Sequence, residues 1–129
     1  MSSERNIRWI AVTAIAFGAL TLVSGGRALF GDVEARAQLG NIVPFVLWFN
    51  FLAGFVYVVA GGGLWLRRRW SVQLARLIAA ATLIVFVAFG VHIAGGGAFE
   101  MRTAVAMTLR LLFWIAIAMV SASLIRARA

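Results

Sequence analysis

Cysteine is absent from this sequence of 129 residues, and histidine and proline occur only once each. Without cysteine, the chain by itself forms no disulfide and offers no thiol nucleophile, iron–sulfur ligand or covalent haem attachment. The single histidine, His92, excludes a multi-histidine metal site or a bis-histidine haem within one protomer. We therefore expect no metal site and no intrinsic cofactor.

Charged side chains are also scarce, at 12% of the residues, whereas hydrophobic residues make up 64%. A soluble domain averages about 25% charged and roughly 45–50% apolar residues. A soluble domain of this length would need far more polar residues to cover its surface, so most of the surface must face lipid. Because the apolar runs are continuous rather than alternating, they favour helices over the strands of a transmembrane barrel.

Four apolar runs are each about as long as the roughly 20 residues that cross a bilayer. They cover about 9–26, 42–66, 72–95 and 103–125. The sequence therefore predicts an all-α fold, a four-helix transmembrane bundle forming one membrane domain over residues 1–129. For the first run, a cleaved signal peptide ending near Ser24 and Gly26 is the alternative, and we expect a retained helix.

The arginines, which are the only basic residues apart from His92, predict the topology. One group lies at the two termini and between the second and third runs: Arg5, Arg8, Arg67, Arg68, Arg69, Arg76, Arg126 and Arg128. The other two loops hold Arg27, Arg36 and Arg102 together with Asp32, Glu34 and Glu100. The positive-inside rule then places both termini in the cytoplasm of a bacterium, with the chain in the inner membrane. Arginines at helix ends indicate contact with lipid head groups and argue against a nucleic-acid partner.

Small residues indicate where the helices end and where they pack. The glycine triplets 61–63 and 95–97 are expected to close the second and third helices. Three pairs of small residues one helical turn apart predict close contacts between helices. These pairs are Ala75 with Ala79, Ala104 with Thr108, and Ala118 with Ala122.

Arg110 is the polar residue that lies deepest in an apolar run, roughly 10 Å from the start of the fourth run. A charge at that depth is unfavourable unless it is paired. We expect Arg110 to point into the bundle, with a carboxylate, a carbonyl or a side-chain amide within hydrogen-bonding reach. Glu100 is the expected acid, and Arg102 competes for it. The alternative is a structural arginine that bonds only to carbonyls or to Glu100.

Further polar residues lie toward the predicted periplasmic ends of the helices, whereas the cytoplasmic half has almost none inside its runs. The candidate ligand-binding residues are His92, Arg110, Glu100, Asn50 and Arg102, with Trp114 one turn beyond Arg110. Their distribution predicts a pocket in the outer half of the bundle. Each also has a structural alternative, such as a hydrogen-bonded histidine at the interface or an asparagine that joins two helices.

Three features of the chain occur together in one known family. The first helix carries Arg8, Gly18, Gly25, Gly26 and Arg27, a glycine-rich second helix leads into 67–69, and an alanine-rich third helix ends in His92. Over most of its length the chain resembles the DoxX-like membrane proteins, small four-helix bundles of bacterial inner membranes. The resemblance implies a redox association, since one member is a subunit of a thiosulfate:quinone oxidoreductase. The absence of cysteine argues against thiol chemistry by this chain.

Two classes of function follow. The first is an accessory subunit that binds an amphipathic ligand, a quinone or a lipid, near His92 and Arg110, without catalytic activity of its own. The second is a structural or assembly partner, in a homo-oligomer or with another membrane protein. A small transporter subunit is a third and less favoured class, because the sequence shows no inverted repeat and no broken helix.

Overall fold

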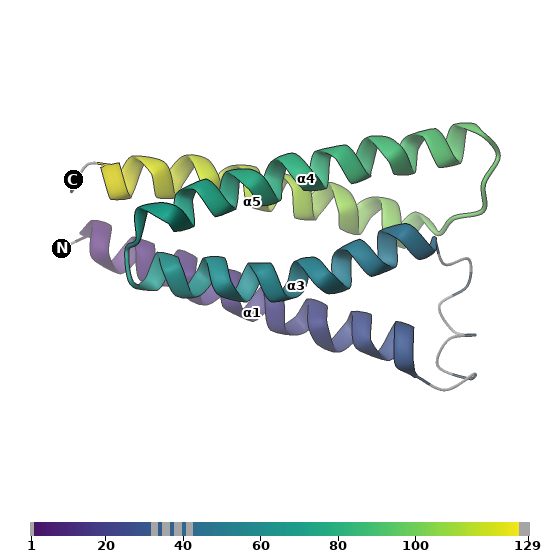
Figure 1. Ribbon diagram of the computed structural model, residues 1–129, viewed down its shortest axis with the longest axis horizontal. Coiled ribbons are helices and arrows are strands. Elements are labelled where there is room, and N and C mark those ends of the chain that lie inside the picture. The colour runs from purple at the N-terminus through teal and green to yellow at the C-terminus, as the bar shows by residue number, and fades with distance from the viewer. Residues whose placement is uncertain (1, 32–33, 35–36, 38–39, 41–42, 127–129) are drawn as a thin grey trace.

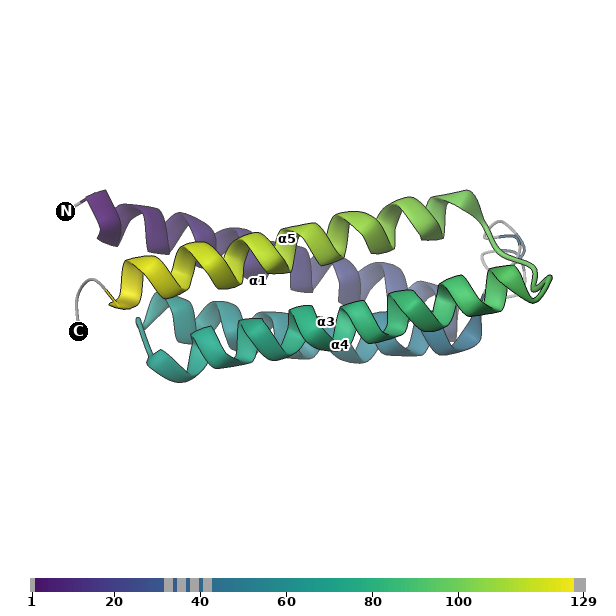
Figure 2. The same ribbon diagram turned by 90° about the horizontal axis from the view of Figure 1, so that it is seen from above.

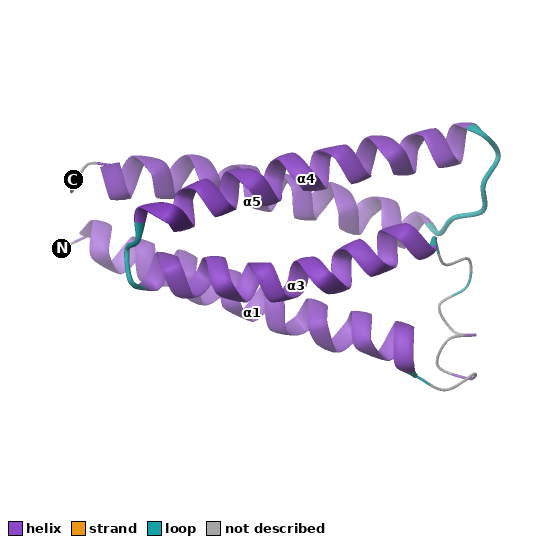
Figure 3. Cartoon of the chain, in the orientation of Figure 1, coloured by secondary structure: helices purple, strands orange, loops and turns teal. Residues whose placement is uncertain are grey.

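The computed structural model describes residues 2–31, 34, 37, 40 and 43–126. These residues contain four long helices and no strand: α1 (Ser2–Phe30), α3 (Pro44–Trp65), α4 (Arg69–Ala94) and α5 (Met101–Arg126) (Figures 1 and 3). Each helix contains a stretch long and apolar enough to cross a membrane. The predicted bundle of four such helices is confirmed. Asp32, Arg36 and Arg128, which entered the topology prediction, lie outside the described residues.

Helix α1 is longer than the apolar run that predicted it. It begins at Ser2 rather than near residue 9 and ends at Phe30 rather than near residue 26. An apolar run marks only the part of a helix that faces lipid, and good helix formers such as arginine continue the helix beyond it. Arg27 lies in the last turn of α1, where a positive charge complements the helix dipole. The other six helix ends agree with the predicted ones to within three residues.

The two glycine triplets have different roles. Gly95 caps α4 by donating its N–H to the carbonyl of Val91, and Gly96 follows with a φ of +85°, a conformation that favours glycine. The predicted turn at 95–97 is confirmed. The prediction that 61–63 ends a helix is wrong, because α3 continues through these residues to Trp65. The absence of a side chain at Gly61 lets α1 approach α3 closely. A Cβ atom on Gly61 would lie 3.0 Å from the carbonyl oxygen of Ala11 on α1.

The helices form an antiparallel bundle with two unlike ends (Figure 1). Both termini and the turn 66–68 lie at one end, the terminal end. The last turn of α1, the first turn of α3 and the loop 95–100 lie at the other, the loop end. Each helix packs against its neighbour in sequence, whereas α1 and α5 make few contacts. These two helices cross when seen from above (Figure 2), and α1 diverges from α5 toward the loop end (Figure 1).

The interface between α1 and α3 is the tightest in the bundle. Buried small residues recur every seven positions on α1, at Ala11, Gly18 and Gly25. On α3, Gly61 faces the first of them, Gly54 the second and Phe51 the third. A Cβ atom on Gly18 would lie 2.9 Å from the carbonyl oxygen of Gly54. Such small residues let helix backbones approach closely in lipid, where apolar burial alone does not drive helices together.

Two of the three small-residue pairs predicted from sequence lie in the core. Ala75 and Ala118 are buried, and Ala79 and Ala122 pack against the same cluster. The pair of Ala104 and Thr108 does not follow the prediction, because Thr108 is exposed and its hydroxyl bonds to the Ala104 carbonyl of its own helix. A threonine hydroxyl in a helix can donate a hydrogen bond to the carbonyl oxygen of the residue four positions earlier. It therefore needs no hydrogen-bond acceptor on a neighbouring helix.

Large apolar side chains cover the outside of the bundle. Leu20, Ile84 and Met119, on three different helices, are 68%, 70% and 69% exposed. In water such a surface would be strongly unfavourable, whereas it matches the hydrocarbon of a bilayer. Together with the four apolar helices, this surface identifies the chain as a multi-pass membrane protein.

Candidate functional site

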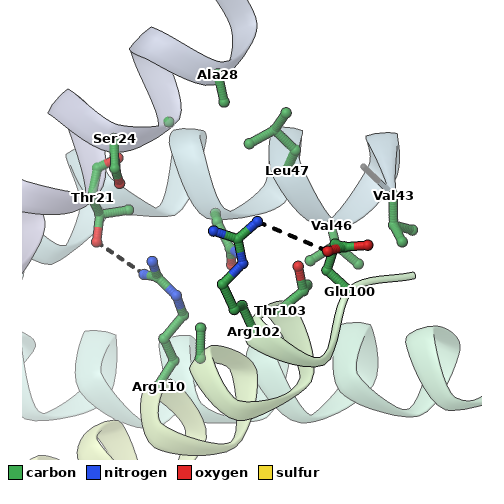
Figure 4. Close-up of a pocket in the computed structure, with 13 residues that line it drawn as sticks. Thr21, Ser24, Ala28, Val43, Val46, Leu47, Glu100, Arg102, Thr103 and Arg110 are labelled. Carbon is green, nitrogen blue, oxygen red and sulfur yellow. Dashed lines mark hydrogen bonds and ion pairs between the residues drawn. The ribbon is translucent and has the colours of Figure 1, made fainter. Parts of the chain in front are cut away.

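A cavity of about 350 Å³ lies between α1, α3 and α5 in the half of the bundle toward the loop end (Figure 4). Its apolar wall is formed by Gly25, Ala28, Val43, Val46, Leu47 and Ala106. Its polar wall is formed by Thr21, Ser24, Asn50, Glu100, Arg102, Thr103 and Arg110. A largely apolar cavity with a few converging polar groups is the usual form of a small-molecule site.

Arg110 forms the deep end of the cavity, the floor, together with Thr21 (Figure 4). Its Nη1 donates a hydrogen bond of 2.9 Å to Oγ1 of Thr21, and its guanidinium carbon lies 5.0 Å from the ring centre of Phe17. The prediction that Arg110 points into the bundle is confirmed. The expected acid partner is wrong, since Thr21 on α1 takes the place that Glu100 was expected to occupy.

Depth explains why Arg110 and Glu100 do not pair. Arg110 is nine residues from the first residue of α5, Met101, so it lies roughly 14 Å along the helix axis. Thr21 is nine residues from Phe30, the last residue of α1, and therefore lies at the same level. Glu100 precedes α5 and remains at the loop end, where Figure 4 shows Arg102 between it and Arg110.

Glu100 and Arg102 lie at the shallow end of the cavity, its mouth. Nη2 of Arg102 is 3.8 Å from Oε1 of Glu100, and the Arg102 side chain is 71% exposed. An exposed pair at this distance contributes little to stability. The Glu100 carboxylate also lies against Gly40, where a Cβ atom would be 2.9 Å from Cδ of Glu100. Gly40 has a φ of +74°, so both its backbone and the space around it favour glycine.

Asn50 and Arg110 each bring an unsatisfied polar atom to the cavity region. Oδ1 of Asn50 and Nε of Arg110 are buried and have no hydrogen-bond partner. Both residues line the cavity, one from α3 and one from α5. Buried polar atoms are nearly always hydrogen-bonded in folded proteins, so these two atoms mark a polar region beside the cavity in which hydrogen-bonding capacity is left unused.

An aromatic cluster lies on the far side of Arg110. Tyr57 and Trp114 are fully buried, and their ring centres are 4.8 Å apart. The Tyr57 hydroxyl lies near Arg110, Thr82 and Trp114, but none of them meets it in hydrogen-bonding geometry. Trp114 was predicted as a ligand-binding residue. The structure places it behind the floor, against Tyr57, and not on the cavity wall.

His92 lies outside the cavity as well. Its Nε2 is 3.0 Å from the carbonyl oxygen of Ala98, and its ring packs over Gly97 and lies edge-on to Phe45. This position ties the end of α4 to the loop 95–100. A ligand-binding role for His92 therefore has no support from its surroundings.

The structure thus brings together four of the six residues predicted as ligand-binding, namely Asn50, Glu100, Arg102 and Arg110. Thr21 and Ser24, on α1, were missed. A signal for Thr21 was present, because it is a polar residue inside the first apolar run. Threonine commonly bonds to its own helix, however, so only its level with Arg110 distinguishes it.

Within the described part of the chain, no group of three or more histidine, cysteine, aspartate or glutamate side chains could hold a metal ion. Among the described residues, the cavity wall presents the donors of Asn50, Arg102 and Arg110, the hydroxyls of Thr21, Ser24 and Thr103, and the carboxylate of Glu100. Comparisons with protein-family models, curated proteins and solved structures give no match.

Proposed function

We propose that this chain binds an amphipathic molecule, a lipid or a quinone, in the cavity between α1, α3 and α5. The observation that carries the proposal is a cavity in which buried polar atoms without partners lie beside an apolar wall. Nε of Arg110 and Oδ1 of Asn50 lack partners, while Val43, Val46 and Leu47 line the wall. A polar head at the floor and an apolar tail along the wall would satisfy both surfaces.

The tail has a route into the bilayer. Helices α1 and α5 make few contacts with each other, so the side of the cavity between them is not closed by tight packing. In this proposal a ligand enters sideways from the membrane and not through the loops. It follows that the chain acts as an accessory subunit that holds or presents a ligand, and we assign it no catalytic step of its own.

The proposal includes a bacterial inner-membrane location with both termini in the cytoplasm. The arginines Arg67, Arg68 and Arg69 at the terminal end support this orientation through the positive-inside rule. Reporter fusions at residue 129 and in the turn 66–68 should then report cytoplasm, and fusions near Glu34 and Gly97 should report periplasm. A periplasmic C-terminus would place the cavity in the opposite leaflet and contradict this part of the proposal.

A structural role for Arg110 is the second candidate, because one specific contact favours it. The hydrogen bond from Arg110 to Thr21 joins α5 to α1, two helices that otherwise touch little. In this alternative the chain would be an assembly partner, in a homo-oligomer or another complex, and the cavity would hold only water. A transporter role has no comparable observation in its favour, since the four helices in the described part of the chain run unbroken.

Replacement of Arg110 by methionine separates the two candidates. Methionine keeps much of the length but removes the charge and the hydrogen bonds. If the arginine holds a ligand, lipid or quinone extracted with the protein from native membranes should be lost, while thermal stability stays the same or rises. If the arginine instead stabilises the contact between α1 and α5, Arg110→Met should lower the thermal stability, and the amount of bound ligand should stay the same. Mass spectrometry of the extract and a thermal unfolding curve measure the two outcomes.

The resemblance to DoxX-like proteins remains a prediction and keeps a quinone among the candidate ligands. A quinone offers two carbonyl oxygens, which can accept hydrogen bonds from a guanidinium. A phospholipid or a fatty acid offers charged oxygens, for which a guanidinium fork is better suited. Whether the positive charge of Arg110 is matched by a charged ligand therefore distinguishes a lipid from a quinone.

A further inference from the structure

We infer that the ligand's head group is anionic, a carboxylate or a phosphate, and that Arg110 supplies the matching positive charge. This inference rests on the proposed function and narrows it from amphipathic ligands in general to anionic lipids. It makes neutral amphiphiles, quinones among them, poor ligands for this cavity.

The balance of charge around the cavity carries the argument. An arginine keeps its charge inside proteins. Among the described residues, Arg110 has the hydroxyls of Thr21 and Tyr57 and the ring of Phe17 as neighbours, and no carboxylate lies within ion-pair distance of it. Among the described residues of the wall, Glu100 is the one acid, and it lies beside Arg102. These described residues therefore bring two cations and one anion, and Arg110 is the cation with no acid beside it.

Arg110 also has N–H donors that lack an acceptor. A guanidinium has five N–H donors in a planar fork that matches the two oxygens of a carboxylate or phosphate. Thr21 accepts a bond from Nη1, and the buried Nε has no partner. A charge surrounded by apolar groups is costly unless it is paired and hydrogen-bonded, so an anionic head group would satisfy both the charge and the donors.

The depth of Arg110 favours a lipid over a free anion. The guanidinium belongs to a residue roughly 14 Å along α5 from its loop end, about half the thickness of the hydrocarbon layer. Between this level and the mouth the wall is mostly apolar, with Ala28, Val46 and Ala106. A bare anion gains nothing from this wall, whereas the first methylene groups of an acyl chain bury against it.

Equilibrium binding to the full chain in nanodiscs of zwitterionic phosphatidylcholine tests the inference. The probes are radiolabelled laurate and dodecyl phosphate as anionic amphiphiles, dodecanol and decylubiquinone as neutral ones, and acetate and inorganic phosphate as anions without a tail. The variants are Arg110→Gln, which removes the charge, and Arg110→Lys, which keeps it. Arg76→Gln is the matched control, because Arg76 is an exposed arginine that does not line this cavity. Circular dichroism and thermal unfolding confirm that each variant is folded.

We expect the unsubstituted chain to bind both anionic amphiphiles at least about tenfold more tightly than the neutral ones, as for hydrogen bonds to a charged group. Arg110→Gln should abolish this preference, whereas Arg110→Lys and Arg76→Gln should keep it. Equal binding of neutral and anionic amphiphiles would overturn the inference and leave the proposed function standing. Binding of none of the amphiphiles would overturn both. Binding of acetate or phosphate as tight as that of the amphiphiles would overturn the assignment to a lipid.

Discussion

Helix α1 meets its two neighbours in opposite ways. Toward α3 it presents Gly18, which lies so close to Gly54 that a single methyl group would collide with the facing backbone. Toward α5 it presents Phe17 and Thr21, which meet an aromatic ring and the long side chain of Arg110. The interface of α1 with α3 is closely packed, whereas the interface of α1 with α5 is loosely packed. Both interfaces involve the same helix, and both lie in lipid.

The difference shows which side chains decide where a membrane bundle closes. In lipid, apolar side chains gain little by leaving the hydrocarbon, so helices pack closely only where small residues let the backbones touch. The edge-to-face contact of Phe17 with Phe113, with ring centres 4.8 Å apart, instead keeps α1 and α5 at the distance of two aromatic side chains. The cavity is the space that this separation leaves toward the loop end.

The largest expected effect comes from filling the closely packed interface. Gly61→Val places a Cβ atom 3.0 Å from the carbonyl oxygen of Ala11 and 3.1 Å from the backbone nitrogen of Ile15. Backbone atoms cannot rotate away, so we expect a loss of about 3 kcal/mol in the free energy of unfolding, the upper end of the usual range for overpacking. Detergent-induced unfolding in mixed micelles, followed by circular dichroism, measures this value.

The control for this prediction is the next residue along the chain. A Cβ atom on Gly62 meets nothing within 4 Å, so Gly62→Val should leave stability unchanged or slightly raised. Equal losses in the two variants would mean that helix α3 is weakened by valine itself. In that case the close contact between α1 and α3 would not be what stabilises the bundle.

A smaller effect is expected at the loosely packed interface. Thr21→Val keeps the shape of the side chain and removes the oxygen that accepts the bond from Arg110. Interhelical hydrogen bonds in membrane proteins contribute about 0.6 kcal/mol on average, so we expect a loss of this order. Thr13→Val is the control, because the Thr13 hydroxyl bonds only to the carbonyl of Trp9 in its own helix. A loss as large as that of Gly61→Val would show that the two interfaces do not differ in strength.

The sequence predicted the helices far better than the contacts between them. Runs of apolar residues specify a membrane-spanning helix locally, and the positions of all four followed from them. The partner of Arg110 is 89 residues away in the sequence, and no local pattern indicates which helix lies beside α5. Glu100 was expected because it is near in sequence and acidic. The structure instead selects Thr21, which has the same depth and faces Arg110 across the cavity.

The glycines of α3 illustrate the same limit. A run of three glycines is typical of a turn, although the apolar run 42–66 that predicted this helix includes residues 61–63. The approach of α1 explains why glycine is found here inside the helix, because Gly61 lies against Ala11 and Ile15. The level of a residue in the membrane can be predicted from its place in an apolar run, but the direction in which its side chain points cannot.

His92 provides the smallest expected effect and the sharpest test of that distinction. Its place in the sequence predicted a ligand-binding residue, whereas its side chain bonds to the carbonyl of Ala98 outside the cavity. We therefore expect His92→Phe to change laurate binding by less than about twofold and the free energy of unfolding by about 0.5 kcal/mol, the lower end of the range for one lost hydrogen bond, since the bond to Ala98 lies at the surface. Asn50→Leu, at a residue that lines the cavity, should weaken the same binding more strongly, since it removes the unsatisfied amide. If instead His92→Phe weakens binding as much as Asn50→Leu does, the site extends to the loop 95–100, and the boundary drawn here between the open cavity and its surroundings is wrong.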